Sequence, residues 1–204
     1  MSDSYGFGAD SKYCHPGSNV LINKLGIADA KELEKSERQI TTFKLTRVSN
    51  NPPAGIINLD YLKLLHKLVF EEIYAWAGEF RAVNIAKGNL FCSWEYLESQ
   101  GKAIFDELAS ENYLLDVVDI DKMAKRLAYY LSEINVLHPF REGNGRIQRL
   151  LIQIMANCAG FDIDYSSITG DEMVVASIAA FNGDYLPMTK LMRRALASKL
   201  SNTG

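Results

Sequence analysis

HPFREGNGRIQR, at residues 138–149, is the segment around which the rest of this sequence is organised. From Arg146 onward, apolar residues recur at the spacing that places them on one face of a helix: Ile147, Leu150, Leu151, Ile154, Met155 and Cys158. This periodicity predicts a buried helix that begins at or just before Gly145 and ends near residue 159, where Gly160 is a natural stop. The polar residues of the segment therefore gather at the start of a buried helix.

Gly143, Asn144 and Gly145 lie at the first turn of this helix. Backbone N–H groups at a helix start have no partner within the helix, and the helix dipole is positive there. Glycines also let phosphate oxygens approach the backbone closely. Arg146 and Arg149 share the polar face, so that two guanidinium groups can reach one polyphosphate. The turn therefore predicts an anion site that suits a triphosphate better than a single phosphate.

His138 and Glu142 precede the anion-binding turn. His138 has an unperturbed pKa close to neutral, which makes it the candidate general base for a hydroxyl proton. Glu142 offers a hard oxygen ligand for Mg²⁺ shared with nucleotide phosphates. Pro139 favours an extended backbone at His138, and Phe140 is expected to anchor a rigid loop in the core. Each residue alone has an ordinary structural explanation, but their combination favours a phosphate-handling active site.

The segment resembles the signature of the Fic family, His-x-Phe-x-Asp/Glu-Gly-Asn-Gly-Arg-x-x-Arg, and it matches every specified position. The resemblance implies a mainly α fold, a Fic-type helical bundle with a short β-hairpin flap beside the active-site loop. It also implies a protein adenylyltransferase, which transfers AMP from ATP to a Tyr, Thr or Ser hydroxyl of a target protein. The acid at position 142, as in the AMP-transferring members, disfavours transfer of phosphate or phosphocholine.

Composition sets further bounds. A chain of 204 residues with 48% hydrophobic and 23% charged residues is typical of one globular domain, expected here to span residues 1–204. The net charge of −3 gives no sign of a binder of nucleic acids or anionic membranes. The three cysteines are widely spaced and fit a reducing compartment.

The sequence shows no signal peptide and no membrane-spanning run of apolar residues. The expected location is therefore the bacterial cytoplasm, and delivery into a host cell stays open.

The rest of the chain is predicted to be largely helical. Residues 1–20 are expected to form a loosely ordered lead-in tied down through Tyr5, Phe7 and Tyr13. Apolar periodicity and capping residues predict further helices at 29–48, 58–75, 93–110, 119–137, 171–182 and 187–200, with a weakly extended segment at 161–168. His66 lies beside the apolar stripe of the second helix, where a hydrogen-bonded core histidine is the better interpretation than a functional one.

Residues 81–92, here called the flap, change from helical to alternating periodicity around a turn at Lys87-Gly88-Asn89, which predicts a β-hairpin. The exposed edge of such a ribbon can pair with an extended segment of another protein. Trp-Ala-Gly-x-x-Arg at 76–81 is similar to Fic proteins, in which a hairpin flap docks the target side chain. The resemblance assigns target docking to Val83, Ile85, Lys87, Gly88, Leu90 and Phe91; without the signature, a hairpin that only covers the core would be preferred.

Many Fic proteins carry an inhibitory helix, Ser/Thr-x-x-x-Glu-Gly/Asn, whose Glu pairs with the second arginine of the signature. In this sequence, Glu precedes Gly or Asn only at Glu142 and Glu111, and neither has Ser or Thr four residues earlier. The resemblance therefore points to the class restrained by a separate small antitoxin, with Arg149 as the contact for the inhibitory Glu. Members of this class modify subunits of bacterial type II topoisomerases, which makes such subunits the leading candidate targets.

Two alternatives stay open at this point. One is the catalytic domain of a secreted effector that AMPylates host GTPases. The other is a nucleotide-binding interaction module without catalytic turnover, although the presence of both His138 and Glu142 argues against it.

Overall fold

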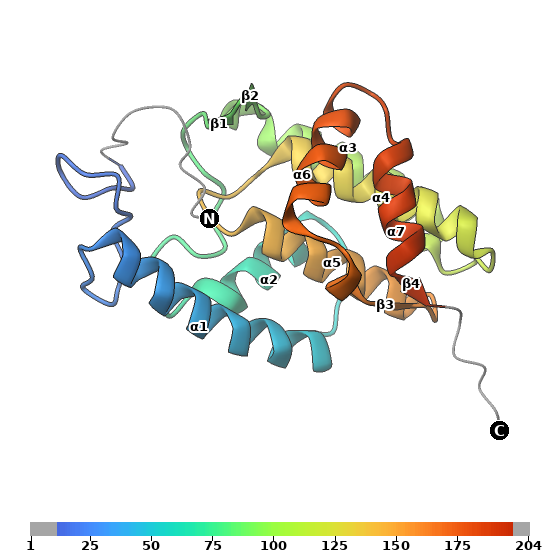
Figure 1. The fold of residues 1–204 in the computed structure, drawn as a ribbon, viewed down its shortest axis with the longest axis horizontal. Coiled ribbons are helices and arrows are strands. Elements are labelled where there is room, and N and C mark those ends of the chain that lie inside the picture. Colours follow the sequence, from blue (N-terminus) through green and yellow to red (C-terminus); the bar gives the residue numbers. More distant parts are fainter. Residues whose placement is uncertain (1–11, 198–204) are drawn as a thin grey trace. The chain divides into compact units, whose positions relative to one another are not determined.

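The computed structural model describes residues 12–197, which are mainly helical (Figure 1). The α-helices of this range are α1 (Ala30–Asn50), α2 (Leu59–Phe70), α3 (Leu97–Ser110), α4 (Ile120–Leu137), α5 (Asn144–Cys158), α6 (Gly170–Phe181) and α7 (Leu186–Ala195). Two short antiparallel ribbons pair β1 (Ala86–Lys87) with β2 (Asn89–Leu90), and β3 (Asp162–Ile163) with β4 (Leu196–Ala197). Single 3₁₀ turns lie at Trp94–Tyr96, Asn112–Leu114 and Tyr165–Ser167. The predicted fold class, mainly α with a short hairpin, is confirmed.

Capping residues set the starts of several helices. The side chains of Asp29, Asn58 and Asp119 accept hydrogen bonds from the backbone N–H three residues later, at 2.9, 2.9 and 2.7 Å. Each bond satisfies one of the N–H groups that a helix start leaves without an internal partner. The starts predicted for α1, α2 and α4 are therefore correct.

Two helix ends differ from prediction, one for a local and one for a tertiary reason. α2 ends at Phe70 rather than near residue 75, because the Phe70 carbonyl accepts from both Ile73 and Tyr74 and the chain turns there. α7 ends at Ala195 rather than near residue 200, because the next two residues form β4 and pair with β3. Helical periodicity carries no information about either event.

The described chain folds as two compact units. The first combines the described part of Met1–Gln100 with His138–Ile147. In it α1 packs against α2, whose apolar face is fully buried at Leu62, Leu65, Val69 and Phe70. Burial of such side chains stabilises a fold by about 1.5–3 kcal/mol each. This unit contains the signature loop, the flap and the first turn of α5.

The lead-in is tied to the first unit through Tyr13, as expected. The Tyr13 side chain is buried, its hydroxyl accepts a hydrogen bond from the Ala82 backbone N–H at 3.1 Å, and its ring meets Trp76 edge-on. Tyr5 and Phe7, the other expected anchors, lie outside the described residues.

The second unit combines Gly101–Leu137 with the described part of Gln148–Gly204. In it α7 packs against both α4 and α6. Arg126 of α4 makes ion pairs with Glu107 and Glu111, which fasten the end of α3 to α4. None of the helices between residues 12 and 197 has the length and apolarity needed to cross a bilayer.

Candidate active site

The signature loop, residues 138–143, is fixed to the start of α5 by the Asn144 side chain. Its carboxamide accepts a hydrogen bond from the Phe140 N–H at 2.9 Å and donates one to the Phe140 carbonyl at 2.8 Å. The Phe140 ring is buried and stacks on His66 with a centroid separation of 3.9 Å. The expected anchoring by Phe140 is confirmed, and the Asn144 side chain holds the loop while its backbone belongs to the helix start.

His138 adopts a left-handed backbone with φ of 46°, so the expected extended conformation is wrong. Histidine tolerates this region better than most residues, but the conformation still stores strain. Two hydrogen bonds from Arg81 hold it: the His138 carbonyl accepts from Arg81 Nε at 2.8 Å, and the Pro139 carbonyl accepts from the Arg81 N–H at 2.9 Å. His138 is 7% exposed, and its imidazole stacks face to face on the Phe91 ring of the flap with a centroid separation of 3.8 Å. The candidate base is therefore held from the backbone and covered by a flap side chain.

Arg81 is the residue that joins the signature loop to the flap, and sequence reasoning gave it no role. Arg81 is 2% exposed, and besides its bond to His138 its guanidinium donates to the carbonyls of Val83 (2.6 Å) and Cys92. These two carbonyls lie near opposite ends of the flap, outside the paired residues of its two strands. The Trp-Ala-Gly-x-x-Arg pattern was the available signal, but only the fold shows what its arginine holds.

His66 lies beneath the loop as a neutral core histidine, as interpreted from the sequence. Its Nδ1 accepts a hydrogen bond from the Gly78 N–H at 2.9 Å, so the proton is on Nε2, which donates to the Glu142 carbonyl at 3.1 Å. Burial, above all, lowers the pKa of His66 from 6.5 to about 3. The ring thus connects the Trp-Ala-Gly segment to the backbone of Glu142 without carrying charge.

The depressed pKa of His66 predicts an acid-sensitive fold. In the unfolded chain His66 binds a proton below about pH 6.5, whereas in the folded chain it binds one only near pH 3. The contribution of neutral His66 to stability is therefore complete above pH 6.5 and is lost as the pH is lowered. From this group alone, the free energy of unfolding should be about 2 kcal/mol lower at pH 5 than at pH 7. Urea unfolding of wild type and His66→Gln at both pH values, without nucleotide or divalent cations, measures it. His66→Gln should be less stable at pH 7 but lose less on acidification; an equal loss in both proteins contradicts the assignment.

Gly143 immediately precedes α5, at a point where no side chain fits. Its φ is 82°, and a Cβ there would lie 2.3 Å from Cζ of Phe70. Its carbonyl accepts from the N–H groups of Arg146 and Ile147 at 3.1 Å, which confirms the predicted helix start. The Gly143 N–H donates to Glu142 Oε1 at 2.7 Å, so this carboxylate lies at the positive end of the helix.

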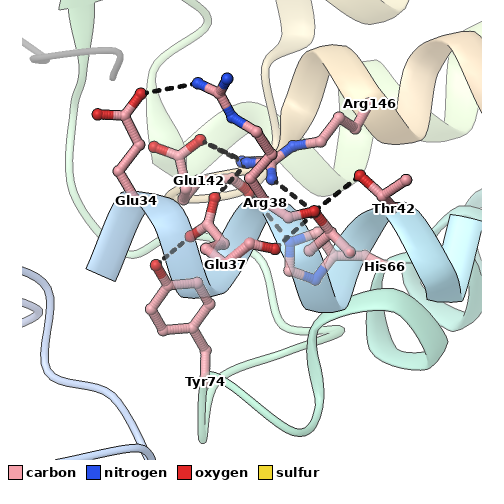
Figure 2. A network of polar contacts seen from close by, with 10 residues as sticks. Glu34, Glu37, Arg38, Thr42, His66, Tyr74, Glu142 and Arg146 are labelled. Carbon is pink, nitrogen blue, oxygen red and sulfur yellow. Dashed lines mark hydrogen bonds and ion pairs between the residues drawn. The ribbon is translucent and has the colours of Figure 1, made fainter. Parts of the chain in front are cut away.

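Arg146 lies in a network of acidic and hydroxyl groups contributed by α1, the segment after α2 and the signature loop (Figure 2). Its guanidinium donates to Glu37 Oε1 at 2.6 Å, to Thr41 Oγ1 at 3.1 Å and to Glu142 Oε1 at 3.3 Å. The second oxygen of Glu37 accepts from the Tyr74 hydroxyl. Burial disfavours the charge of Arg146, but the carboxylates outweigh burial and raise the pKa of the guanidinium above its usual value. Glu37 was not singled out in the sequence because nothing local connects it with the signature.

Arg149 lies one turn beyond Arg146 on α5 and is half-buried. Its backbone carbonyl accepts a hydrogen bond from the Tyr165 hydroxyl at 3.4 Å, which fixes this turn of the helix. The helical spacing expected between the two arginines is therefore present.

The flap has an exposed tip and a buried base. Among the residues assigned to target docking, Lys87, Gly88 and Leu90 are exposed, Val83 and Phe91 are half-buried, and Ile85 is buried. Gly88 has φ of 76° and forms the turn between β1 and β2, and the Phe91 N–H donates to the Ile85 carbonyl at 3.2 Å. The predicted hairpin is confirmed, while target docking by these residues stays a prediction.

The carboxylate of Glu142 fits a cation held mainly by a nucleotide. Between residues 12 and 197, no three His, Cys, Asp or Glu side chains gather in a cluster that would hold a metal by itself. Mg²⁺ is usually bound in nucleotide sites by one or two carboxylates together with phosphates and water. A single acid beside an anion-binding helix start has this donor chemistry.

Comparison with known proteins decides the family. The model of the Fic/DOC family matches residues 56–156. A probable protein adenylyltransferase of Sinorhizobium fredii, y4lH, is 34% identical over 184 residues, covering 90% of this chain and 94% of that protein. The chain belongs to the Fic/DOC family. The Fic membership and the enzyme class, protein adenylyltransferase, that the signature predicts are thereby confirmed.

Other Fic proteins extend the comparison. Protein adenylyltransferase VbhT of Bartonella schoenbuchensis is 37% identical over 190 residues, which cover 93% of this chain but 40% of VbhT. The N-terminal Fic domain of a VirB-translocated Bep effector protein of Bartonella quintana, solved with bound ADP, superimposes with a TM-score of 0.87 at 27% identity, covering 94% of this chain and 97% of that one. The described fold is thus that of a Fic domain.

Proposed function

We propose that this chain transfers AMP from ATP to a Tyr, Thr or Ser hydroxyl of a target protein. The observation that carries the proposal is the position of His138. Its imidazole is stacked on Phe91 of the flap, and a few residues later the same loop enters the helix start at Gly143. A proton acceptor at this position would serve both a peptide bound at the flap and phosphates bound at the helix start.

In the reaction, the target hydroxyl oxygen attacks the α-phosphorus of ATP in line with the bond to the β-phosphate. The new bond joins that oxygen to AMP, the bond to pyrophosphate breaks, and the hydroxyl proton passes to His138. Backbone N–H groups at Asn144 and Gly145 stabilise the charge on the phosphate oxygens, because they are fixed before the reaction begins. Gly143, whose N–H holds Glu142, lets the phosphates approach the backbone closely.

The two arginines complete the nucleotide site. Arg149 contributes its charge to the terminal phosphates, one helical turn beyond the glycines. Arg146 adds positive potential from its place between Glu37 and Glu142. Phosphoryl-transfer enzymes rely on such positioned charges rather than on covalent chemistry by the protein.

Mg²⁺ bound with ATP would be held by Glu142 and would neutralise charge on the phosphates. The helix start alone would bind an anion, and a carboxylate placed there would add a ligand for a cation that is bound with the nucleotide. The role of the chain is therefore to fix the direction of one carboxylate, through the Gly143 N–H and the His66 bond to the Glu142 backbone.

The target would bind along the flap. Leu90 at the tip is 53% exposed, and the hairpin edge offers backbone groups to an extended segment. Such pairing would bring a hydroxyl of the segment to His138. Docking is assigned to Val83, Ile85, Lys87, Gly88, Leu90 and Phe91, with Ile85 acting from below the ribbon.

Restraint of the enzyme would come from outside the chain. Because the Ser/Thr-x-x-x-Glu-Gly/Asn pattern is absent from the sequence, a small antitoxin that supplies a Glu to Arg149 is the proposed partner. Type II topoisomerase subunits in the bacterial cytoplasm are the proposed targets.

The second candidate function is that of a secreted effector, favoured by the similarity to the translocated effector protein of Bartonella quintana. Host GTPases would then be the targets.

Radiolabelling tests the proposed activity and distinguishes the toxin function from the effector function. Purified protein is incubated with Mg²⁺ and ATP labelled on the α-phosphate, in bacterial and in eukaryotic lysate, with His138→Ala alongside. A protein band labelled only by wild type is expected in the bacterial lysate. Label confined to the eukaryotic lysate would support the effector function. Absence of label in both, with nucleotide binding intact, would favour the interaction module without turnover.

A further inference from the structure

Glu37 is a nearly buried acid that faces the signature from another part of the chain. It lies in the middle of α1, and its side chain is 12% exposed. One oxygen accepts from Arg146 at 2.6 Å and the other from the Tyr74 hydroxyl. Figure 2 shows Glu37 between these two residues. A buried carboxylate costs considerable desolvation free energy unless its partners are well placed, so this arrangement fixes the position of all three groups.

Arg146 is shared unequally between two carboxylates. The nitrogen that bonds Glu37 at 2.6 Å also approaches Glu142 Oε1, but only to 3.3 Å. Thr41, one turn after Glu37 on α1, accepts from the other terminal nitrogen at 3.1 Å. The guanidinium also lies 4.8 Å from the centroid of the Phe70 ring. α1 therefore holds Arg146 at two of its nitrogens, and the contact with Glu142 is the longest of the three.

We propose that Glu37 is a positioning residue that draws Arg146 away from a full ion pair with Glu142 and so keeps the Glu142 carboxylate available to the divalent cation. The inference rests on the proposed function, in which Glu142 holds Mg²⁺ with ATP. Arginine and Mg²⁺ compete for the same carboxylate oxygens, because each is a cation seeking an anionic ligand. Without the negative charge of Glu37, Glu142 would be the remaining carboxylate in the described contacts of Arg146, and the guanidinium would move towards it.

If Glu37 positions Arg146 in this way, loss of its charge should change the affinity for the divalent cation rather than the affinity for the nucleotide. Mutation of residues that hydrogen-bond the ligands of a metal commonly changes metal affinity by about 10–100-fold. Glutamine at position 37 has almost the same shape as glutamate and still accepts a hydrogen bond from Tyr74 or Arg146. Glu37→Gln therefore removes the charge with little change in packing, and its melting temperature provides a check of folding.

Binding of the ATP analogue AMPPNP is measured by calorimetry over a series of Mg²⁺ concentrations. For Glu37→Gln, the Mg²⁺ concentration at half-maximal binding should rise about tenfold, with nucleotide affinity at saturating Mg²⁺ close to that of wild type. Glu34→Gln is the matched control, because Glu34 precedes Glu37 by one turn on α1 and pairs with the exposed Arg38 at 3.0 Å. The Glu34→Gln variant loses the same charge and should leave the Mg²⁺ dependence of AMPPNP binding unchanged.

Other outcomes have distinct meanings. If Glu37→Gln weakens AMPPNP binding equally at every Mg²⁺ concentration, Glu37 serves the phosphates through Arg146 and the inference is overturned, while the proposed function stands. If Glu142→Gln leaves the Mg²⁺ dependence intact, Glu142 is not the ligand and the inference fails with that assignment. If wild type binds no AMPPNP at any Mg²⁺ concentration, the proposed function itself is wrong.

Discussion

His138→Ala is expected to lower the rate of AMP transfer by about 10²–10⁴-fold, the range that a positioned general base contributes. The substitution removes the proton acceptor but leaves the carbonyls of His138 and Pro139, through which Arg81 holds the loop. The nucleotide site at Gly143 should therefore be preserved. The check is a time course of label transfer from α-phosphate-labelled ATP, combined with AMPPNP binding by calorimetry.

His138→Asn provides the control for the backbone. The left-handed φ of 46° disfavours alanine, whereas asparagine tolerates it as well as histidine does. Both variants should lose transfer alike and bind AMPPNP like wild type. A variant that transfers AMP at the rate of wild type would show that another group accepts the proton. Recovery of activity in His138→Asn alone would assign the loss in His138→Ala to loop geometry.

Arg81→Lys is expected to lower AMP transfer at least about 100-fold even where the protein is folded, because displacement of a catalytic group by about 1 Å has effects of that size. Lysine keeps the charge, but its single nitrogen cannot bond the carbonyls of His138, Val83 and Cys92 together. Hydrogen bonds to charged groups contribute about 1.5–3 kcal/mol each, so a marked fall in the melting temperature should accompany the substitution. Transfer and AMPPNP binding are measured well below that melting temperature.

Arg38→Lys is the matched control for this experiment. Arg38 lies on α1, its side chain is 70% exposed, and it pairs with Glu34 rather than with the signature loop. This variant should retain the stability and activity of wild type, since exposed ion pairs contribute little. Arg81→Lys with undiminished transfer, or with a loss explained fully by weaker AMPPNP binding, would contradict the coupling between the flap and His138.

The local features of this fold could be predicted because each depends on a few neighbouring residues. Asp29, Asn58 and Asp119 cap helices where they were expected to. The periodicity after Arg146 placed α5 correctly, and the turn at Gly88 placed the hairpin. Capping, periodicity and turn formation involve groups within one or two turns of chain, which the order of residues specifies directly.

Two of the predictions that failed involve contacts over long sequence separations. Pro139 favours an extended His138, but the bonds from Arg81 impose the opposite sign of φ. The end of α7 depends on pairing with a strand far earlier in the chain. In both places, tertiary hydrogen bonds outweighed a local preference of about the size of one such bond.

The family, the order of the helices and the functional groups of the signature could be read from the sequence, because they follow from residue types at fixed spacing. The groups that hold the signature in place became known from the fold. Arg81 reaches His138, His66 reaches the Glu142 backbone, and Glu37 reaches Arg146 across 109 positions of sequence. Buried polar groups must find partners wherever the fold provides them, and such partners leave no local pattern.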